Sequence, residues 1–92
     1  MIQSFKHKGL EKFFLTGSKA GIQPKHAARI EEQLFAINRA KVPADMDFPG
    51  WFLHSLHGKL DGHWSVRVSG NWRITFRFNG NDAEVVDYQD YH

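Results

Sequence analysis

The sequence predicts an α+β domain, in which two N-terminal helices pack on an antiparallel or mixed sheet of about four strands. Three observations lead to this prediction. Residues 63–78 contain two runs of alternating apolar and polar residues, residues 24–41 carry an apolar stripe at helical spacing, and a strong turn signal at residues 79–82 precedes a last apolar run. Because the expected helices precede the strands, they are expected to gather on one face of a single sheet. One domain is expected over residues 1–92.

The clearest strands lie in residues 63–78. Alternation with period two is the pattern of a half-buried strand, and the apolar members here are Trp64, Val66 and Val68, then Trp72, Ile74, Phe76 and Phe78. A two-residue loop would mix apolar and polar residues on each face, whereas a three-residue loop at residues 69–71 puts every apolar side chain on one side. We therefore expect the three-residue loop, with Val68 opposite Trp72.

On the other face of this hairpin, Arg67 is expected to lie directly opposite Arg73, with Arg77 further along the same strand. Like charges placed opposite each other destabilise a sheet. The two guanidinium groups therefore either splay into water or bind an anion between them. Their planar forks suit the oxygens of a phosphate.

Two helices are expected before the sheet. In residues 6–15, Leu10 and Phe13 stand at helical spacing, and Gly17 is a suitable C-cap. A second helix is expected to begin near Pro24, because proline is favoured in a first helical turn, and to end near residue 40 or 41. The apolar stripe of this helix, which is expected to pack on the sheet, consists of Ala27, Ile30, Leu34 and Ile37.

The remaining segments before the central hairpin are short. Their composition predicts an edge strand over residues 1–5, a loop over residues 42–50, a strand over residues 51–54 and a loop over residues 55–62. His26, in the first turn of the second helix, is expected at the surface.

The last strand is expected over residues 83–88, after the turn at residues 79–82. Its inward face stays open, because Ala83 with Val85 and Val86 with Tyr88 are both apolar pairs on opposite faces. Tyr88 is a candidate for packing on the second helix.

Composition excludes several classes of protein. Hydrophobic residues make up 41% of the chain, which is too many for a disordered protein. The sequence has no cysteine, so it has neither a disulfide framework nor a thiolate metal site. No apolar run approaches the ~18 residues of a membrane-spanning helix, and no signal-peptide pattern is present. A soluble, cytoplasmic protein without a membrane partner is expected.

The net charge of +2 is unevenly distributed. Residues 1–41 carry eight Lys or Arg against three Glu, whereas residues 42–92 carry four Lys or Arg against seven Asp or Glu. The basic N-terminal part therefore either faces a polyanion, with an attraction that weakens in salt, or forms an ordinary solvated helical surface.

Groups able to move protons lie at two places in the chain. One set precedes the central hairpin and the other ends the sequence: His54, His57 and His63, then Asp87, Asp90, Tyr91 and His92. Histidine titrates nearest neutral pH. Internal cleavage of RNA needs a base, a cation and an acid, and it requires no metal. The alternatives are solvated histidines and a frayed terminus, and no spacing here matches a Cys/His zinc site.

Four motifs resemble those of the HigB toxins, which belong to the RelE/ParE superfamily. They are His54-Ser-Leu-His-Gly, Gly62-His-Trp-Ser-Val-Arg-Val, Asn71-Trp-Arg-Ile-Thr-Phe and the final Asp90-Tyr-His. The opening Met1-Ile-Gln-Ser-Phe-Lys-His-Lys-Gly-Leu agrees as well, so the resemblance runs from end to end. It implies a RelE-like fold and a toxin of a type II toxin–antitoxin system.

The resemblance also implies an activity and partners. HigB toxins are ribosome-dependent endoribonucleases that cut mRNA in the ribosomal A site without a cofactor or metal, and a HigA-type antitoxin blocks them. Carried over by position, the catalytic residues are His54, Arg73, Asp90, Tyr91 and His92. RNA or phosphate binding falls to Arg67, His57, Lys59 and Arg77, and docking on ribosomal RNA to Lys6, Lys8, Lys12, Lys19, Lys25 and Arg29.

One position departs from the family pattern. The family often has a lysine in a His-Pro-Leu-Lys-Gly loop where this chain has His57, so a permanent cation is replaced by one that titrates. Three rival functions stay open at this point: a ParE-like inhibitor of DNA gyrase, a non-catalytic RNA- or protein-binding module, and a toxin whose activity has decayed.

Overall fold

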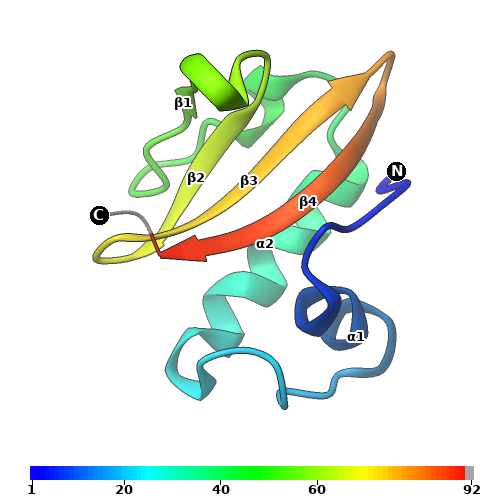
Figure 1. The fold of residues 1–92 in the computed structure, drawn as a ribbon, viewed down its shortest axis with the longest axis vertical. Coiled ribbons are helices and arrows are strands. Elements are labelled where there is room, and N and C mark those ends of the chain that lie inside the picture. Colours follow the sequence, from blue (N-terminus) through cyan, green and yellow to red (C-terminus); the bar gives the residue numbers. More distant parts are fainter. Residues whose placement is uncertain (91–92) are drawn as a thin grey trace.

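Residues 1–90, which are the residues described in the computed structural model, form two helices and a four-stranded antiparallel sheet (Figure 1). The elements are α1 (Lys8–Thr16), α2 (Ala27–Arg39), β1 (His54–Ser55), β2 (Trp64–Ser69), β3 (Trp72–Asn79) and β4 (Asp82–Asp90). The strands follow one another in the sheet in chain order. The predicted α+β architecture is confirmed.

Both predicted helices are present. The ring Nδ1 of His7 accepts a hydrogen bond from the backbone N–H of Leu10 (2.9 Å) and caps α1, which ends at Gly17 as predicted. A short 3-10 turn, Pro24–His26, precedes α2. The predicted apolar stripe is buried, and α2 packs with it against β2 and β4.

Two glycines allow α1 to approach the segment that leads into α2. A Cβ added to Gly9 would lie 2.7 Å from the Cα of Gly21, and a Cβ added to Gly21 would lie 2.5 Å from the Cα of Gly9. Real Cβ atoms do not come so close to backbone atoms. This contact therefore requires glycine at both positions.

The β2–β3 hairpin has the predicted register except beside its turn. Trp64 pairs with Phe76, Val66 with Ile74 and Arg67 with Arg73. The expected three-residue loop is wrong: Ser69, not Val68, pairs with Trp72, and the turn consists of Gly70 and Asn71. Val68 is the extra residue of a β-bulge, which restores the parity that a two-residue turn alone would have broken.

A second β-bulge settles the face of β4. Thr75 pairs with Asp87 and Arg77 with Glu84, so Val85 and Val86 together oppose Phe76. Val85, the extra residue of this bulge, has a left-handed backbone (φ 48). As a result Ala83, Val86 and Tyr88 are all buried on the inner face.

Two of the shorter predicted strands differ in the structure. Residues 51–53 are irregular, and the strand leading into the histidine loop is limited to His54–Ser55, because Trp51 turns into the core instead of extending the strand. The first residues run beside β4 through two isolated parallel bridges, Ile2 with Ala83 and Phe5 with Val86, and form no longer strand.

The core lies between the two helices and the inner face of the sheet. Its largest fully buried side chains include Phe76, Leu10, Ile30, Leu34, Ile37, Met46 and Ile74. His26 also lies here with 3% of its surface exposed, so the expectation of a surface position was wrong. Within residues 1–90, no helix is long and apolar enough to cross a membrane.

Candidate active site

The outer face of the sheet presents two rows of polar side chains. Strand pairing aligns His54 with Ser65, Ser65 with Thr75, and Thr75 with Asp87, so one row crosses all four strands. The next row aligns Arg67, Arg73 and Gln89. Ser65 and Thr75 are themselves buried (3% and 1% exposed), so the accessible groups of the two rows are the ones at their ends and in the arginine pair.

A pocket of about 340 Å³ opens on this face between β1, β2 and β3. It is lined by Phe52, His54, Leu56, Ser65, Arg67 and Arg73. The structure therefore brings His54, which ends an irregular segment, together with the two facing arginines, which belong to the most regular hairpin.

Arg67 is fixed through its backbone. Its N–H donates to the carbonyl oxygen of Trp51 (2.7 Å), and its carbonyl accepts from Nε2 of the buried Gln33 on α2 (2.7 Å). Its guanidinium carbon lies 5.6 Å from the ring centroid of Phe52. In Arg73, Nη1 donates to the carbonyl oxygen of Gly70 (3.3 Å), which directs that guanidinium toward the hairpin turn.

The β4 side of the polar face is occupied by an amide. Nε2 of Gln89 donates to Oγ1 of Thr75 (3.2 Å) and to Oδ2 of Asp87 (2.9 Å). Oδ1 of Asp87 accepts from the N–H of Tyr88 (2.9 Å). The Asp87 carboxylate therefore makes its hydrogen bonds within the sheet, and Asp87 is not among the residues that line the pocket.

Asp90 ends β4 opposite Trp72, the residue before Arg73. Strand alternation therefore puts its side chain on the face of Tyr88, whose pKa the Asp90 charge helps to raise, and not on the face that carries His54, Arg67 and Arg73. The other two predicted catalytic residues, Tyr91 and His92, lie outside the described residues.

Arg77 has different surroundings from Arg67 and Arg73. Its guanidinium forms an ion pair with Glu84 on β4, with Nε donating to Oε2 (2.9 Å) and Nη2 closer still. The hydrogen bond from Arg77 holds the pKa of the Glu84 carboxyl below its usual value. Arg77 does not line the pocket, and the structure does not bring it together with His54.

The other predicted binding residues are spread over the surface. His57 and Lys59 are exposed in the loop that contains the 3-10 turn Gly58–Leu60, beside the pocket but not among its lining residues. The residues assigned to docking all belong to the N-terminal half; five are exposed and Arg29 is half-buried: Lys6, Lys8, Lys12, Lys19, Lys25 and Arg29.

A polar aromatic cluster lies behind the Arg73 end of the sheet. The hydroxyl of Tyr88 lies 2.6 Å from Nδ1 of His26, and the Tyr88 ring stacks on Trp72 with centroids 4.5 Å apart. Burial, with the nearby charge of Lys25, lowers the pKa of His26. Burial raises the pKa of Tyr88. Both shifts favour the neutral forms of the two groups that share this hydrogen bond.

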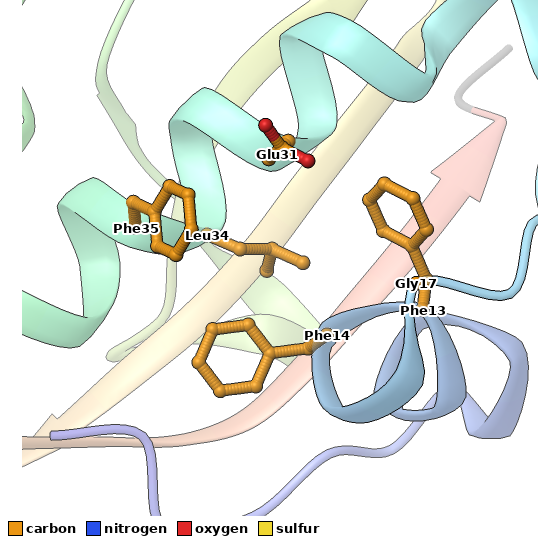
Figure 2. Close-up of a pocket in the computed structure, with 6 residues that line it drawn as sticks. All are labelled: Phe13, Phe14, Gly17, Glu31, Leu34 and Phe35. Carbon is orange, nitrogen blue, oxygen red and sulfur yellow. The ribbon is translucent and has the colours of Figure 1, made fainter.

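A second depression lies on the helical side of the molecule, between α1 and α2 (Figure 2). It encloses about 130 Å³ and is mostly apolar, with Phe13, Phe14, Leu34 and Phe35 among its lining residues. The His54 and arginine side chains are absent from its lining. This groove is therefore distinct from the polar pocket.

Sequence reasoning missed three residues that line the pocket, Phe52, Leu56 and Ser65, and also Gln33, which supports it from α2. Ser65 could have been found, because it alternates with Arg67 on the same strand face. Phe52 and Gln33 carried no usable signal: Phe52 enters the pocket through an irregular turn, and Gln33 reaches β2 from the buried side of a helix. Contacts of this kind follow from tertiary packing and have no periodicity.

The helices, the sheet and the histidine–arginine pocket together define the RelE-like class of small toxin domains. A family model described as "RelE-like toxin of type II toxin-antitoxin system HigB" matches residues 3–92. A protein of Proteus vulgaris named Endoribonuclease HigB is 42% identical over 92 residues, which cover the whole of both chains. The chain belongs to the HigB-like toxin family. Membership of a toxin–antitoxin family implies an antitoxin as partner.

Proposed function

We propose that this protein, as a HigB-like endoribonuclease toxin, cleaves mRNA on the translating ribosome in the cytoplasm and is inhibited by a HigA-type antitoxin. The observation that carries the proposal is the pocket, in which His54 shares one opening with the facing Arg67 and Arg73. The full-length identity of 42% to a protein named an endoribonuclease supports the same reaction.

In the proposed mechanism Arg73, with Arg67, holds the scissile phosphate. Two guanidinium groups directly opposite each other repel when empty, and an anion between them removes that repulsion. Negative charge grows on the phosphoryl oxygens as the 2′-oxygen attacks phosphorus, so fixed cations stabilise the transition state more than the ground state.

The proton transfers are assigned to His54 and His92. One takes the proton of the 2′-hydroxyl as the 2′-oxygen attacks phosphorus, and the other gives a proton to the 5′-oxygen as the phosphorus–oxygen bond breaks. Each transfer contributes roughly 10²–10⁴-fold to the rate. Asp90 orients or charges a neighbouring histidine, and Tyr91 stacks on a base or positions the phosphate. The reaction in this form uses no metal.

His57 is proposed to replace the lysine of the family pattern as a cation near the RNA, with Lys59 as a second candidate. If the charge on His57 assists cleavage, activity falls as pH rises through the range in which imidazoles lose their proton. His57→Lys should then flatten the pH profile. An unchanged profile in that variant would remove His57 from the mechanism.

The basic N-terminal residues are proposed to dock on ribosomal RNA. They are mostly exposed and lie on or beside the two helices, away from the polar face. Reversing the charge of Lys8 and Lys12 together should weaken co-sedimentation with ribosomes and make it less sensitive to salt. Unchanged co-sedimentation would contradict this assignment.

Cleavage mapping tests the proposal directly. Antitoxin-free protein is added to a labelled mRNA, alone and on programmed ribosomes, with and without EDTA, and new 5′ ends are located by primer extension. Cuts at defined codon positions that need ribosomes and survive EDTA are expected. Absence of cuts, with cells still arrested on expression, would instead favour a ParE-like action on gyrase.

A further inference from the structure

Phe52 combines two features that are costly for an aromatic residue. The residue is 64% exposed, and its backbone has φ 50, in the left-handed region. Bulky side chains rarely adopt this conformation. Because most of its surface faces water, burial in the core does not explain why a phenylalanine is held there.

The neighbours of Phe52 hold this conformation. Trp51 is buried, and its carbonyl accepts the hydrogen bond from the N–H of Arg67 (2.7 Å). On its other side, the Trp51 ring packs on Phe48 with centroids 4.6 Å apart. The anchored Trp51 and the positive φ of Phe52 together turn the Phe52 ring out of the chain path and beneath the Arg67 guanidinium. Strained backbone of this kind persists where surrounding contacts over-determine it, and it gathers at functional sites.

The ring therefore stands at the edge of the polar pocket, in the same lining as His54, Arg67 and Arg73. An exposed aromatic face beside cations that suit a phosphate is the usual pair of features that binds single-stranded nucleic acid. A bound phosphate would explain the two facing arginines, and a nucleobase stacked on Phe52 would explain the exposed ring.

We propose that Phe52 is a stacking platform for a nucleobase next to the scissile phosphate, a subsite that adds base-stacking energy to RNA binding. The proposal rests on the proposed function, because the arginine pair must hold the RNA phosphate. Every base has a π-face, so this subsite holds the strand in place without selecting one base by hydrogen bonds.

The test uses cleavage on programmed ribosomes by Phe52→Leu, Phe52→Tyr and the control Phe35→Leu. Phe35 is a similarly exposed aromatic (58%), but it lies in the groove between the helices (Figure 2). Phe52→Leu should lower kcat/KM by roughly 5- to 150-fold, the range of one lost stacking interaction. Phe52→Tyr should keep most activity, and Phe35→Leu should match the wild type.

An abasic nucleotide then separates stacking from support of Arg67. The abasic site is placed in turn at each nucleotide near the cut. At one of these positions the missing base should slow cleavage by the wild type. The same missing base should not slow Phe52→Leu any further, because that variant has already lost the stacking contact. The proposal is overturned if, at every position, the loss of rate caused by the missing base and the loss caused by Phe52→Leu are independent and multiply. It is also overturned if Phe52→Leu cuts like the wild type.

A binding measurement keeps this inference separate from the proposed function. A short RNA carrying 2-aminopurine and 2′-O-methyl groups cannot be cut, and stacking quenches its fluorescence. Quenching by the wild type and by Phe52→Tyr, but not by Phe52→Leu, supports the platform even if the wild type makes no cuts. Equal quenching by all three proteins overturns it even if cleavage is normal.

Discussion

The two ends of strand β3 place arginines on the same face of one sheet, in different surroundings. At one end Arg73 faces Arg67, whose guanidinium lies over the Phe52 ring, and both line the pocket with His54. At the other end Arg77 is neutralised by Glu84. Their positions in the strand alternation are equivalent. What distinguishes the arginines proposed to bind RNA from the ion-paired Arg77 is their partners, which the alternation does not reveal.

The side chains buried beneath the two ends of β3 also differ in polarity. Behind Arg73 lie Trp72, Tyr88 and His26, with a hydrogen bond of 2.6 Å inside the cluster. Behind Arg77 lie Phe76 and Phe78, whose rings meet edge to face at 5.9 Å. The end of β3 that carries the pocket therefore packs on aromatic side chains with titratable polar groups, whereas the other end packs on apolar rings alone.

Removing each arginine tests this comparison with the largest expected effect. Arg73→Ala should lower kcat for RNA cleavage by about 10²–10³-fold, the loss found when one donor to a transition-state oxyanion is removed. Arg77→Ala should change it far less, because its charge is already compensated by Glu84. The measurement is single-turnover cleavage on programmed ribosomes. Equal losses in the two variants would erase the proposed difference between the ends.

Removing the Tyr88 hydroxyl tests the support behind Arg73. Tyr88→Phe leaves Nδ1 of His26 buried without this partner, which should lower the free energy of unfolding by about 1–3 kcal/mol. Replacing both partners with apolar rings should recover much of that loss. Denaturant unfolding of Tyr88→Phe and of His26→Phe/Tyr88→Phe measures this. A double variant less stable than Tyr88→Phe would argue against the hydrogen bond as the cause.

The same cluster predicts a loss of stability in acid. Burial lowers the pKa of His26 in the folded protein, so the unfolded chain binds the proton more readily. The contribution of neutral His26 to the free energy of unfolding is therefore fully present above the unfolded pKa of about 6.5. It is lost as pH falls from there through the lower pKa of the folded protein. His26→Gln should reduce this slope in unfolding measured across the range. A slope equal to that of the wild type would assign the loss to other groups.

The smallest expected effect comes from releasing Arg77. Glu84→Gln removes the compensating carboxylate, so binding of a single-stranded RNA at low salt should strengthen by no more than a few-fold, with a steeper dependence on salt. Adding Arg77→Ala to this variant should abolish the gain. Fluorescence anisotropy at two salt concentrations suffices. A gain that persists without Arg77 would point to the general loss of a negative charge.

Periodicity made most of the fold predictable. Alternation in residues 63–78 gave the correct partners for Trp64, Val66 and Arg67, and a stripe at helical spacing gave α2. The predictions are wrong where a single residue interrupts the regular alternation of a strand. Val68 forms a bulge instead of pairing with Trp72, and Trp51 leaves the expected strand to enter the core.

The candidate site was predictable only in part. The facing of Arg67 and Arg73 follows from strand parity, and the structure places His54 beside them. The pairing of Arg77 with Glu84 depends on the bulge in β4, and the burial of His26 depends on a hydroxyl from a distant strand. Such contacts join residues far apart in the chain, and a local pattern does not contain them.

The two β-bulges have a consequence for changes in chain length. β3 pairs with one bulged strand on each side, with Val68 extra in β2 and Val85 extra in β4. Deleting Val85 would join Glu84 to Val86 and give regular pairing, with Ala83 and Val86 both still on the inner face. Deleting a residue from the regularly paired part of β3 would instead exchange the faces on one side of the deletion. One-residue deletions should therefore be tolerated better at the two bulges than within β3.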